Sequence, residues 1–255
     1  NNLGILASYQ GDTETTRRCY EEALAIRQQI GDRAGMGASL NNLGILARDG
    51  GDYARALSLY GEALRIAREL GDKRAMAYPL KNMGVVMVDQ GRYEEAQIYY
   101  EEALALRRQV GEKWGIVSVL NSLGDVFIAR QQYEQAMRYY SESLHLNGEV
   151  GDHQLYVSNL LGVAAAVAYR SPLKDEHLRR AARLLGFAHH WMEKTGVALL
   201  PEWTDDAMRL LAFVQTRLSQ PVYETEYGQG QQMPLASAIA EAVREWKSED
   251  DTVVV

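Results

Sequence analysis

Each block of forty residues in the first two thirds of the chain carries two amphipathic segments separated by a polar break. In the block 32–71, apolar residues stand three or four positions apart in both halves, which is the spacing of one helix face. The first face consists of Met36, Leu40, Leu43 and Ala47, and the second of Tyr53, Ala56, Leu57, Tyr60, Ala63, Leu64 and Ala67. The pattern therefore predicts a pair of helices in each block.

Glycine and aspartate occupy the breaks between the predicted helices. Gly31-Asp32 precedes the first helix of this block, and Gly50-Gly51-Asp52 separates it from the second. Glycine adopts the left-handed backbone that ends many helices, and an aspartate side chain accepts hydrogen bonds from the first amides of the next helix. We therefore expect each break to end one helix and begin another.

Short tags return at the same forty-residue step. They are Asn2-Leu3-Gly4, Asn42-Leu43-Gly44, Asn82-Met83-Gly84 and Ser122-Leu123-Gly124, with a looser copy at Leu160-Leu161-Gly162. A period in this range is typical of a solenoid, in which stacked hairpins bury the apolar surface that none can bury alone. Gly44 and Ala56 are small, so we expect the paired helices to approach closely there. We expect Tyr60 and Ala63 to fill the joint with the following helix.

The rhythm fails after Gly162. A terminal repeat has to cover its neighbour's core, so an irregular end is expected. We predict helices over 175–194, from 201 to about 219 (with Met208, Leu211, Phe213 and Leu218 inside) and over 235–246, with a polar loop over 221–232. The predicted domains are about four regular hairpins plus the first helix of a fifth over 1–168, an irregular helical cap over 169–247 and a flexible tail over 248–255.

The repeated pattern resembles the tetratricopeptide repeat over residues 1 to about 168. The resemblance rests on Leu-Gly in the first helix and on the Ala, Tyr and Ala positions of the second, which one copy places at Ala56, Tyr60 and Ala63. Units of that family have roughly 34 residues, whereas these have forty and end in Gly-Asp. The resemblance implies a right-handed all-α superhelix (an α-α solenoid) with an irregular helical C-terminal cap, whose concave face binds peptides or protein segments.

The segment after the repeats resembles the C-terminal part of bacterial multidomain regulators. The matching residues are Ala182-Arg183-Leu184-Leu185-Gly186, Ala188, Thr195-Gly196, Pro201 and the stretch from Met233-Pro234-Leu235 to Ala242-Val243. Those proteins resemble STAND-type signalling ATPases and LuxR- or AfsR-like transcription regulators, in which such a segment follows a repeat array. The resemblance implies a sensor or protein-interaction module of a larger regulator.

Charge and cysteine content narrow the classes of partner. The net charge of −7 argues against direct binding to nucleic acid, which requires a basic face. Cys19 is the only cysteine, so no internal disulfide forms and a reducing compartment, the cytoplasm, is expected. No apolar run approaches the roughly 20 residues that span a bilayer, so no membrane partner is expected. The chain starts at Asn1, inside a repeat and without Met, and we interpret it as a piece of a longer protein.

The residues around each Leu-Gly tag are the candidates for contact with a partner, because in the resembling family they border the inner groove. A ladder of asparagines suits an extended peptide, since each amide offers a donor and an acceptor. Tyr78 and Tyr156 would add rigid contact area. The candidate groove residues are Asn41, Asn42, Ile45, Tyr78, Lys81, Asn82, Val85, Asn121, Asp125, Tyr156 and Asn159, with Asn1, Asn2 and Ile5 in the first copy.

A second interpretation of the asparagines stays open. Asn before Leu-Gly belongs to the family's own repeat pattern, and it can serve only to hydrogen-bond an adjacent helix. Lys81 and Asp125 break the pattern and are better candidates for selectivity. Lys81, Arg48 and Arg130 are too few basic residues to favour an acidic ligand.

No catalytic constellation is evident, so we predict that the chain is not an enzyme and needs no cofactor. It contains no phosphate loop, no GxSxG motif and no paired acid and base. His189 and Glu193 stand four residues apart, a spacing that permits metal binding, but a third ligand is not evident. We interpret them as a surface pair or a contact between helices.

The sequence therefore predicts a scaffold that binds a protein or peptide segment in a concave groove. We expect it to be the sensory or interaction arm of a larger bacterial signalling or transcription regulator. The alternative is a self-association module that sets the oligomeric assembly of its parent protein. The sequence identifies neither the partner nor the oligomeric state.

Overall fold

The computed structural model describes residues 3, 6, 11–198 and 201–244, without the side chains of residues 201–203. Over these residues the chain is all-α, as predicted, and forms no strand. It divides into two compact units, Asn1–Val119 and Leu120–Val255. Asn1, Asn2, Ile5 and the predicted tail over 248–255 lie outside the described residues, and the domain boundaries at 168 and 247 stay predictions.

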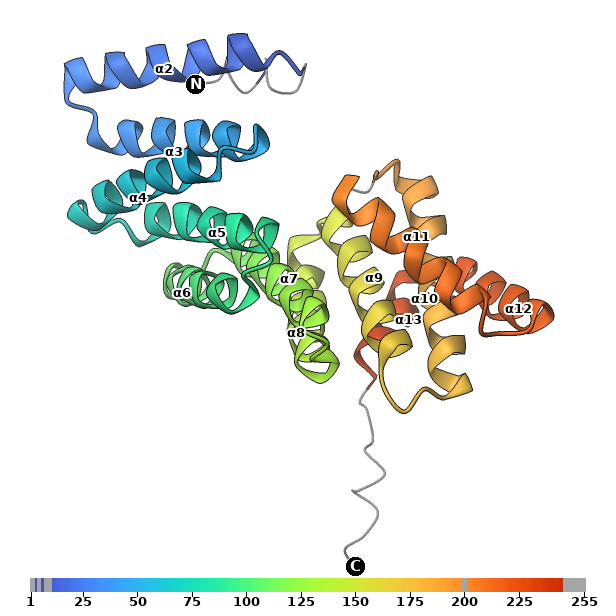
Figure 1. Cartoon of the computed structure of the whole chain (residues 1–255). Coiled ribbons are helices and arrows are strands. Elements are labelled where there is room, and N and C mark those ends of the chain that lie inside the picture. Colours follow the sequence, from blue (N-terminus) through green and yellow to red (C-terminus); the bar gives the residue numbers. More distant parts are fainter. Residues whose placement is uncertain (1–2, 4–5, 7–10, 199–200, 245–255) are drawn as a thin grey trace, which may run out of the picture. The chain divides into compact units, whose positions relative to one another are not determined.

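The described helices pack in tandem (Figure 1). In the first unit each helix from α2 to α5 packs against the next one along the chain. In the second unit α9 contacts α8, α10, α11 and α13, and α10 also contacts α12. The helices are α2 (Thr13–Ile30), α3 (Arg33–Asp49), α4 (Tyr53–Glu69), α5 (Lys73–Asp89), α6 (Tyr93–Val110), α7 (Lys113–Ala129), α8 (Tyr133–Val150), α9 (His153–Tyr169), α10 (Asp175–Thr195), α11 (Pro201–Gln215), α12 (Gln220–Gln231) and α13 (Leu235–Val243).

Aspartate caps begin the helices at the predicted breaks. The Asp32 side chain accepts a hydrogen bond from the backbone N–H of Gly35, and Asp72 does the same for Ala75, both at 2.9 Å. Gly31 ends α2 with a φ of 73°, a conformation that glycine adopts without a steric penalty. The same two residue types therefore end one helix and begin the next, which fixes the length of each unit.

Each regular hairpin closes around a glycine and a tyrosine. A Cβ on Gly44 would lie 2.4 Å from the Tyr60 ring, and a Cβ on Gly124 would lie 2.3 Å from the Tyr140 ring. Both rings are fully buried. Tyr140 also lies against Gly162 of the following helix. The predicted close approach at Gly44 is confirmed.

The polar loop predicted over 221–232 is wrong, because most of this segment forms α12. Two glycines let the backbones of α10 and α12 touch. A Cβ on Gly186 would lie 2.1 Å from the carbonyl oxygen of Tyr227, and a Cβ on Gly230 would lie 2.0 Å from that of Arg183. Packing against α10 therefore stabilises a helix whose composition does not favour one.

The buried face of α11 also differs from the prediction. Met208 is 56% exposed, and Leu210 and Val214 are buried in its place. Leu218 is buried as predicted, although α11 ends before it at Gln215. The predicted stripe was shifted along the helix, and a shift of two positions turns a side chain by more than half of a helical turn.

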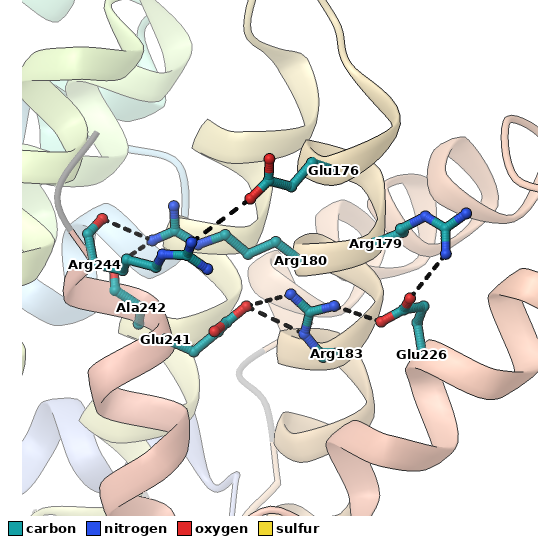
Figure 2. A network of polar contacts seen from close by, with 8 residues as sticks. All are labelled: Glu176, Arg179, Arg180, Arg183, Glu226, Glu241, Ala242 and Arg244. Atoms are coloured by element: carbon teal, nitrogen blue, oxygen red, sulfur yellow. Dashed lines mark hydrogen bonds and ion pairs between the residues drawn. The ribbon is translucent and has the colours of Figure 1, made fainter. Parts of the chain in front are cut away.

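An ion-pair network joins α10 to α12 and α13 (Figure 2). Arg183 donates hydrogen bonds to the carboxylates of Glu226 on α12 and Glu241 on α13. Arg180 is buried and donates to the carbonyl oxygen of Ala242 at 3.2 Å. Because removing one partner of a buried ion pair leaves the other charge uncompensated, this network fixes the positions of the last two helices.

Candidate functional site

The predicted groove residues of the first unit lie on α3 and α5. Ile45 is 36% exposed and Tyr78 is 38% exposed, so both offer apolar surface to a partner. The other five candidates in this unit are partly buried: Asn41, Asn42, Lys81, Asn82 and Val85. The two helices therefore present a mixed surface of amides, one cation and apolar side chains.

Polar side chains link successive first helices in this unit. Asn82 Nδ2 donates to Asn41 Oδ1 at 2.9 Å, which connects α5 to α3. Lys81 Nζ donates to Ser118 Oγ at 2.7 Å, which connects α5 to α7. These asparagines thus hydrogen-bond an adjacent helix, as the second interpretation of the sequence expected, and they stay partly open to solvent.

The predicted groove residues of the second unit are mostly buried. Asn121 and Asn159 are 2% and 0% exposed, and Asn121 Nδ2 donates to Asn159 Oδ1 at 3.3 Å. Tyr156 is buried, and its hydroxyl donates to the carbonyl oxygen of Asn147 at 3.1 Å. Asp125 is partly buried and accepts from a tyrosine hydroxyl at 2.7 Å.

The burial of these residues follows from the helices around α9. In this unit α9 is packed by α8, α10, α11 and α13, so most of its length lies in the interior. Asn159 and Tyr156 sit on this helix and present almost no surface. Equivalent sequence positions in the two units therefore differ in what they offer to a partner.

A cleft of about 360 Å³ opens between α3, α4 and α5 in the first unit. Its floor is apolar and buried, and Asn41, Asn42 and Tyr78 stand among the residues around it. The structure thus brings three of the sequence-predicted residues to one concavity. The floor consists of Ala63, Ile66, Ala67 and Pro79, and the polar lining also includes Asp72 and Arg74.

The charged groups beside the cleft are already partly paired. Arg74 donates two hydrogen bonds to Glu112 Oε1, at 3.0 and 3.2 Å. The Tyr78 hydroxyl donates to the same oxygen at 3.0 Å. Asp72 caps α5 at the mouth of the cleft. Arg74 is thus paired with Glu112, and the carboxylate that lines the cleft is that of Asp72.

Apart from Tyr78, sequence reasoning missed the residues that α4 and α5 contribute to this cleft, among them Ala63, Ile66, Ala67 and Ala75, and it missed Asp72, the cap of α5. The Leu-Gly tags mark only the first helix of each pair, whereas a cleft between helices needs residues from the second helix too. The missing signal was a departure from the repeat: Ala67 and Ala75 stand where neighbouring units have arginine and glycine.

His189 takes part in a contact between α10 and α12 and lies beside Glu193. His189 Nδ1 lies 2.6 Å from the Tyr227 hydroxyl, and His189 Nε2 lies 3.6 Å from the Glu193 carboxylate. Burial raises the pKa of Tyr227 to about 12.

Within the described part of the chain, no three histidine, cysteine or carboxylate side chains gather as a metal site would require. No helix among the described residues has the length and apolarity to cross a bilayer.

Comparison with solved structures finds helical repeat proteins of the same fold. The signal transduction ATPase with numerous domains and a tetratricopeptide repeat sensor from Pyrococcus horikoshii matches with a TM-score of 0.67 and 17% identity, over 95% of this chain and 37% of that one. The putative kinesin light chain repeats of Podosopora anserina match with a TM-score of 0.59 and 14% identity, over 76% and 93% of the two chains. The apo form of RapI matches with a TM-score of 0.59 and 14% identity, over 94% and 82%.

At these identities the likeness concerns the fold alone. No curated protein matches the chain. The family model described as Tetratricopeptide repeat matches residues 1–69 and 74–147, which is over half of the chain. The capped helical pairs of the first unit, the glycine and tyrosine at the closure of each pair, and this match lead to one conclusion: the chain belongs to the tetratricopeptide repeat family.

Proposed function

We propose that this chain is a scaffold that binds a segment of a partner protein along α3 and α5 of the first unit. The observation that carries the proposal is the cleft of about 360 Å³, which has an apolar floor and a polar lining beside the exposed Ile45 and Tyr78. Specific sites combine such an apolar concavity with a few polar groups that orient the ligand. Asn121, Tyr156 and Asn159 are left out of this surface because they are buried.

The amides next to the cleft suit a peptide backbone. Asn41 and Asn42 line it, and a side-chain amide offers both a donor and an acceptor irrespective of the peptide sequence. The exposed Ile45 would provide an apolar contact on the same helix. An extended segment would therefore lie along α3 and α5 and place one side chain in the cleft.

We further propose that the module is the sensory or interaction arm of a larger bacterial signalling or transcription regulator. The support is the likeness of fold over 95% of this chain to part of a signalling ATPase that carries a tetratricopeptide repeat sensor. Docking of a partner segment would then bias the rest of the parent protein through the stacked helices.

Selection of peptides from a random display library on the immobilised chain tests the proposed surface. Ile45→Glu should weaken binding of the selected peptides at least tenfold, because it places a charge on the apolar part of the surface. Ile98→Glu is the matched control, since Ile98 is 63% exposed on α6 and lies outside the cleft. Equal binding by the wild type and Ile45→Glu, or an equal loss in both variants, contradicts the proposal. Light scattering over a concentration series tests the alternative of self-association.

A further inference from the structure

One position in the second helix differs among the first three copies of the repeat. It holds Arg27 in α2, Ala67 in α4 and Arg107 in α6, each forty residues apart. Eight residues later, on the helix that follows in each case, stand Gly35, Ala75 and Gly115. Arginine therefore goes together with glycine in the first and third copies and alanine with alanine in the second, whereas the fourth copy has Asn147 and Leu155.

The arginine of the first such pair reaches into the next helix. Arg27 Nη1 donates to the carbonyl oxygen of Gly35 at 2.8 Å and to Ser39 Oγ at 2.7 Å. Its Nε lies 3.6 Å from Asp32, the residue that caps α3. A Cβ on Gly35 would lie 2.0 Å from Asp32 Oδ2 and 2.6 Å from this Nε, so glycine makes room for the ion pair of the two side chains.

The arginine of the third copy, Arg107, is more deeply buried. Arg107 is 1% exposed and forms an ion pair with Glu112, which stands in the register of Asp32. Its guanidinium also lies 4.7 Å from the centre of the Tyr78 ring. A Cβ on Gly115 would lie 1.8 Å from Arg107 Nη1. Glycine is again required by the neighbouring arginine.

The cleft between α3, α4 and α5 lies where the second copy of the repeat has alanine in place of this arginine. Ala67 and Ala75 both line it, and Asp72 stands in the register of Asp32 and Glu112. At about 360 Å³ the cleft is larger than the ~150 Å³ apolar cavity that accommodates benzene. The space that an internal arginine fills in the neighbouring units is therefore open here.

Two of the acceptors that hold Arg27 have counterparts around the open cleft, whereas the third, Ser39, is replaced in register by Pro79. Asp72 provides a carboxylate at the register of the one that Arg27 meets. Pro79 lies inside α5 and has no N–H, so the Ala75 carbonyl lacks the donor that residue i+4 supplies in an ordinary helix. This carbonyl stands in the register of the Gly35 carbonyl, which accepts from Arg27. Ala75 and Pro79 both line the cleft.

We propose that this cleft binds an arginine side chain of the partner segment. The inference rests on the proposed function, in which a protein segment docks along α3 and α5. The planar guanidinium would bond the Asp72 carboxylate and the Ala75 carbonyl, and its aliphatic stem would lie on the apolar floor. Arg74 also lines the cleft but is paired with Glu112, and the net charge of −7 favours a basic partner.

Titration of the full chain with Nα-acetyl-arginine methylamide tests the cleft directly. Two-dimensional NMR should show saturable shifts at the backbone amides of Ala67, Asp72 and Ala75. The corresponding derivative of citrulline has nearly the same shape without the charge, and it should bind at least tenfold more weakly. Equal binding of the two compounds, or shifts confined to other parts of the chain, overturns the proposal.

Two sets of variants show which group holds the arginine. Ala67→Arg combined with Ala75→Gly copies the neighbouring units and fills the cleft from within, so it should abolish the shifts. Asp72→Asn keeps the capping oxygen but removes the charge, and should weaken binding at least tenfold, whereas Asp52→Asn changes an equivalent cap outside the cleft and should have no effect.

The same variants separate this inference from the proposed function. If selected peptides lose binding in Ile45→Glu but bind Ala67→Arg/Ala75→Gly normally, the segment docks without an arginine in the cleft, and only the inference fails. If the arginine derivative binds the cleft but no peptide depends on Ile45, the proposed docking surface fails while the cleft's preference stands. Loss of both peptide and arginine binding in Ala67→Arg/Ala75→Gly, with an unchanged melting temperature, supports both.

Discussion

Two successive joints of the first unit are built on the same frame and filled differently. The open joint lies between α3, α4 and α5 and has Ala67 and Ala75. The filled joint lies between α5, α6 and the start of α7 and has Arg107 and Gly115. The buried Arg107 side chain forms an ion pair with Glu112 and packs on the Tyr78 ring. The hairpins at both joints are closed alike, by Gly44 against Tyr60 and by Gly84 against Tyr100. The repeat frame thus supplies the fold, and two side chains decide whether a joint is a core or a cleft.

Removal of the arginine should turn the filled joint into an open one. Arg107→Ala is expected to destabilise the chain by about 3 kcal/mol, because it leaves the Glu112 carboxylate without its buried partner. The expected loss of stability is at the low end for a broken buried ion pair, because Arg74 and Tyr78 still donate hydrogen bonds to Glu112. Urea denaturation followed by circular dichroism measures the change.

The control for this substitution is Arg138→Ala, at an exposed position of α8. Its effect should stay within about 0.5 kcal/mol. Similar losses in the two variants would contradict the structural role assigned to Arg107.

A methyl group at Gly115 tests whether the filled joint needs its glycine. Gly115→Ala places a Cβ 1.8 Å from Arg107 Nη1, and overpacking of this kind costs about 1–3 kcal/mol. In an Arg107→Ala background the clash is gone, so the penalty should vanish. The measurement is a double-mutant cycle of unfolding free energies. Gly61→Ala is the control: a Cβ there meets nothing within 4 Å, and it should stabilise by about 0.5–1 kcal/mol.

Alkaline pH tests the hairpin interior rather than the joint. Burial raises the pKa of Tyr60 well above the ordinary value of 10.0. The neutral phenol is favoured in the folded state, so stability should be constant below pH 10 and fall above it, as unfolded tyrosine ionises. The slope is at most about 1.4 kcal/mol per pH unit for one such group. Urea midpoints between pH 8 and 11 check this.

Tyr60→Phe isolates the contribution of that one residue. The Tyr60 hydroxyl is buried without a hydrogen-bond partner among the described residues, so its removal should cost little at neutral pH. The fall of stability above pH 10 should then be shallower than in the wild type. An unchanged slope would show that Tyr60 does not stay protonated in the folded chain.

The smallest effect is expected where the open joint already has room. Ala75→Gly should destabilise by about 1 kcal/mol or less, which is the difference in helix propensity. No arginine on α4 needs the space that the methyl group occupies. Thermal unfolding of this variant beside Gly115→Ala compares the two joints. A loss above about 2 kcal/mol would contradict the open joint, because it would mean that the Ala75 methyl group is tightly packed.

The candidate site was partly predictable. Asn41, Asn42 and Tyr78 were expected from the Leu-Gly tags and do line the cleft. Ala67 and Asp72 were not expected, because their role depends on three helices meeting and on what the neighbouring joints contain. Asn121 stands in the same register as Asn41 but is buried. Position in the repeat therefore identifies a candidate, and the surrounding helices decide whether a partner can reach it.

The sequence by itself determined the regular helical pairs of this protein. A glycine that ends a helix, an aspartate that caps the next one and an apolar residue at every third or fourth position act over a few residues, so they can be recognised without coordinates. The family assignment follows from the same local pattern. The tertiary structure alone decided that 220–231 is a helix, that α9 is buried and that one joint stays open. Those features depend on contacts between residues distant along the chain, such as Gly186 with Tyr227, and no local pattern encodes them.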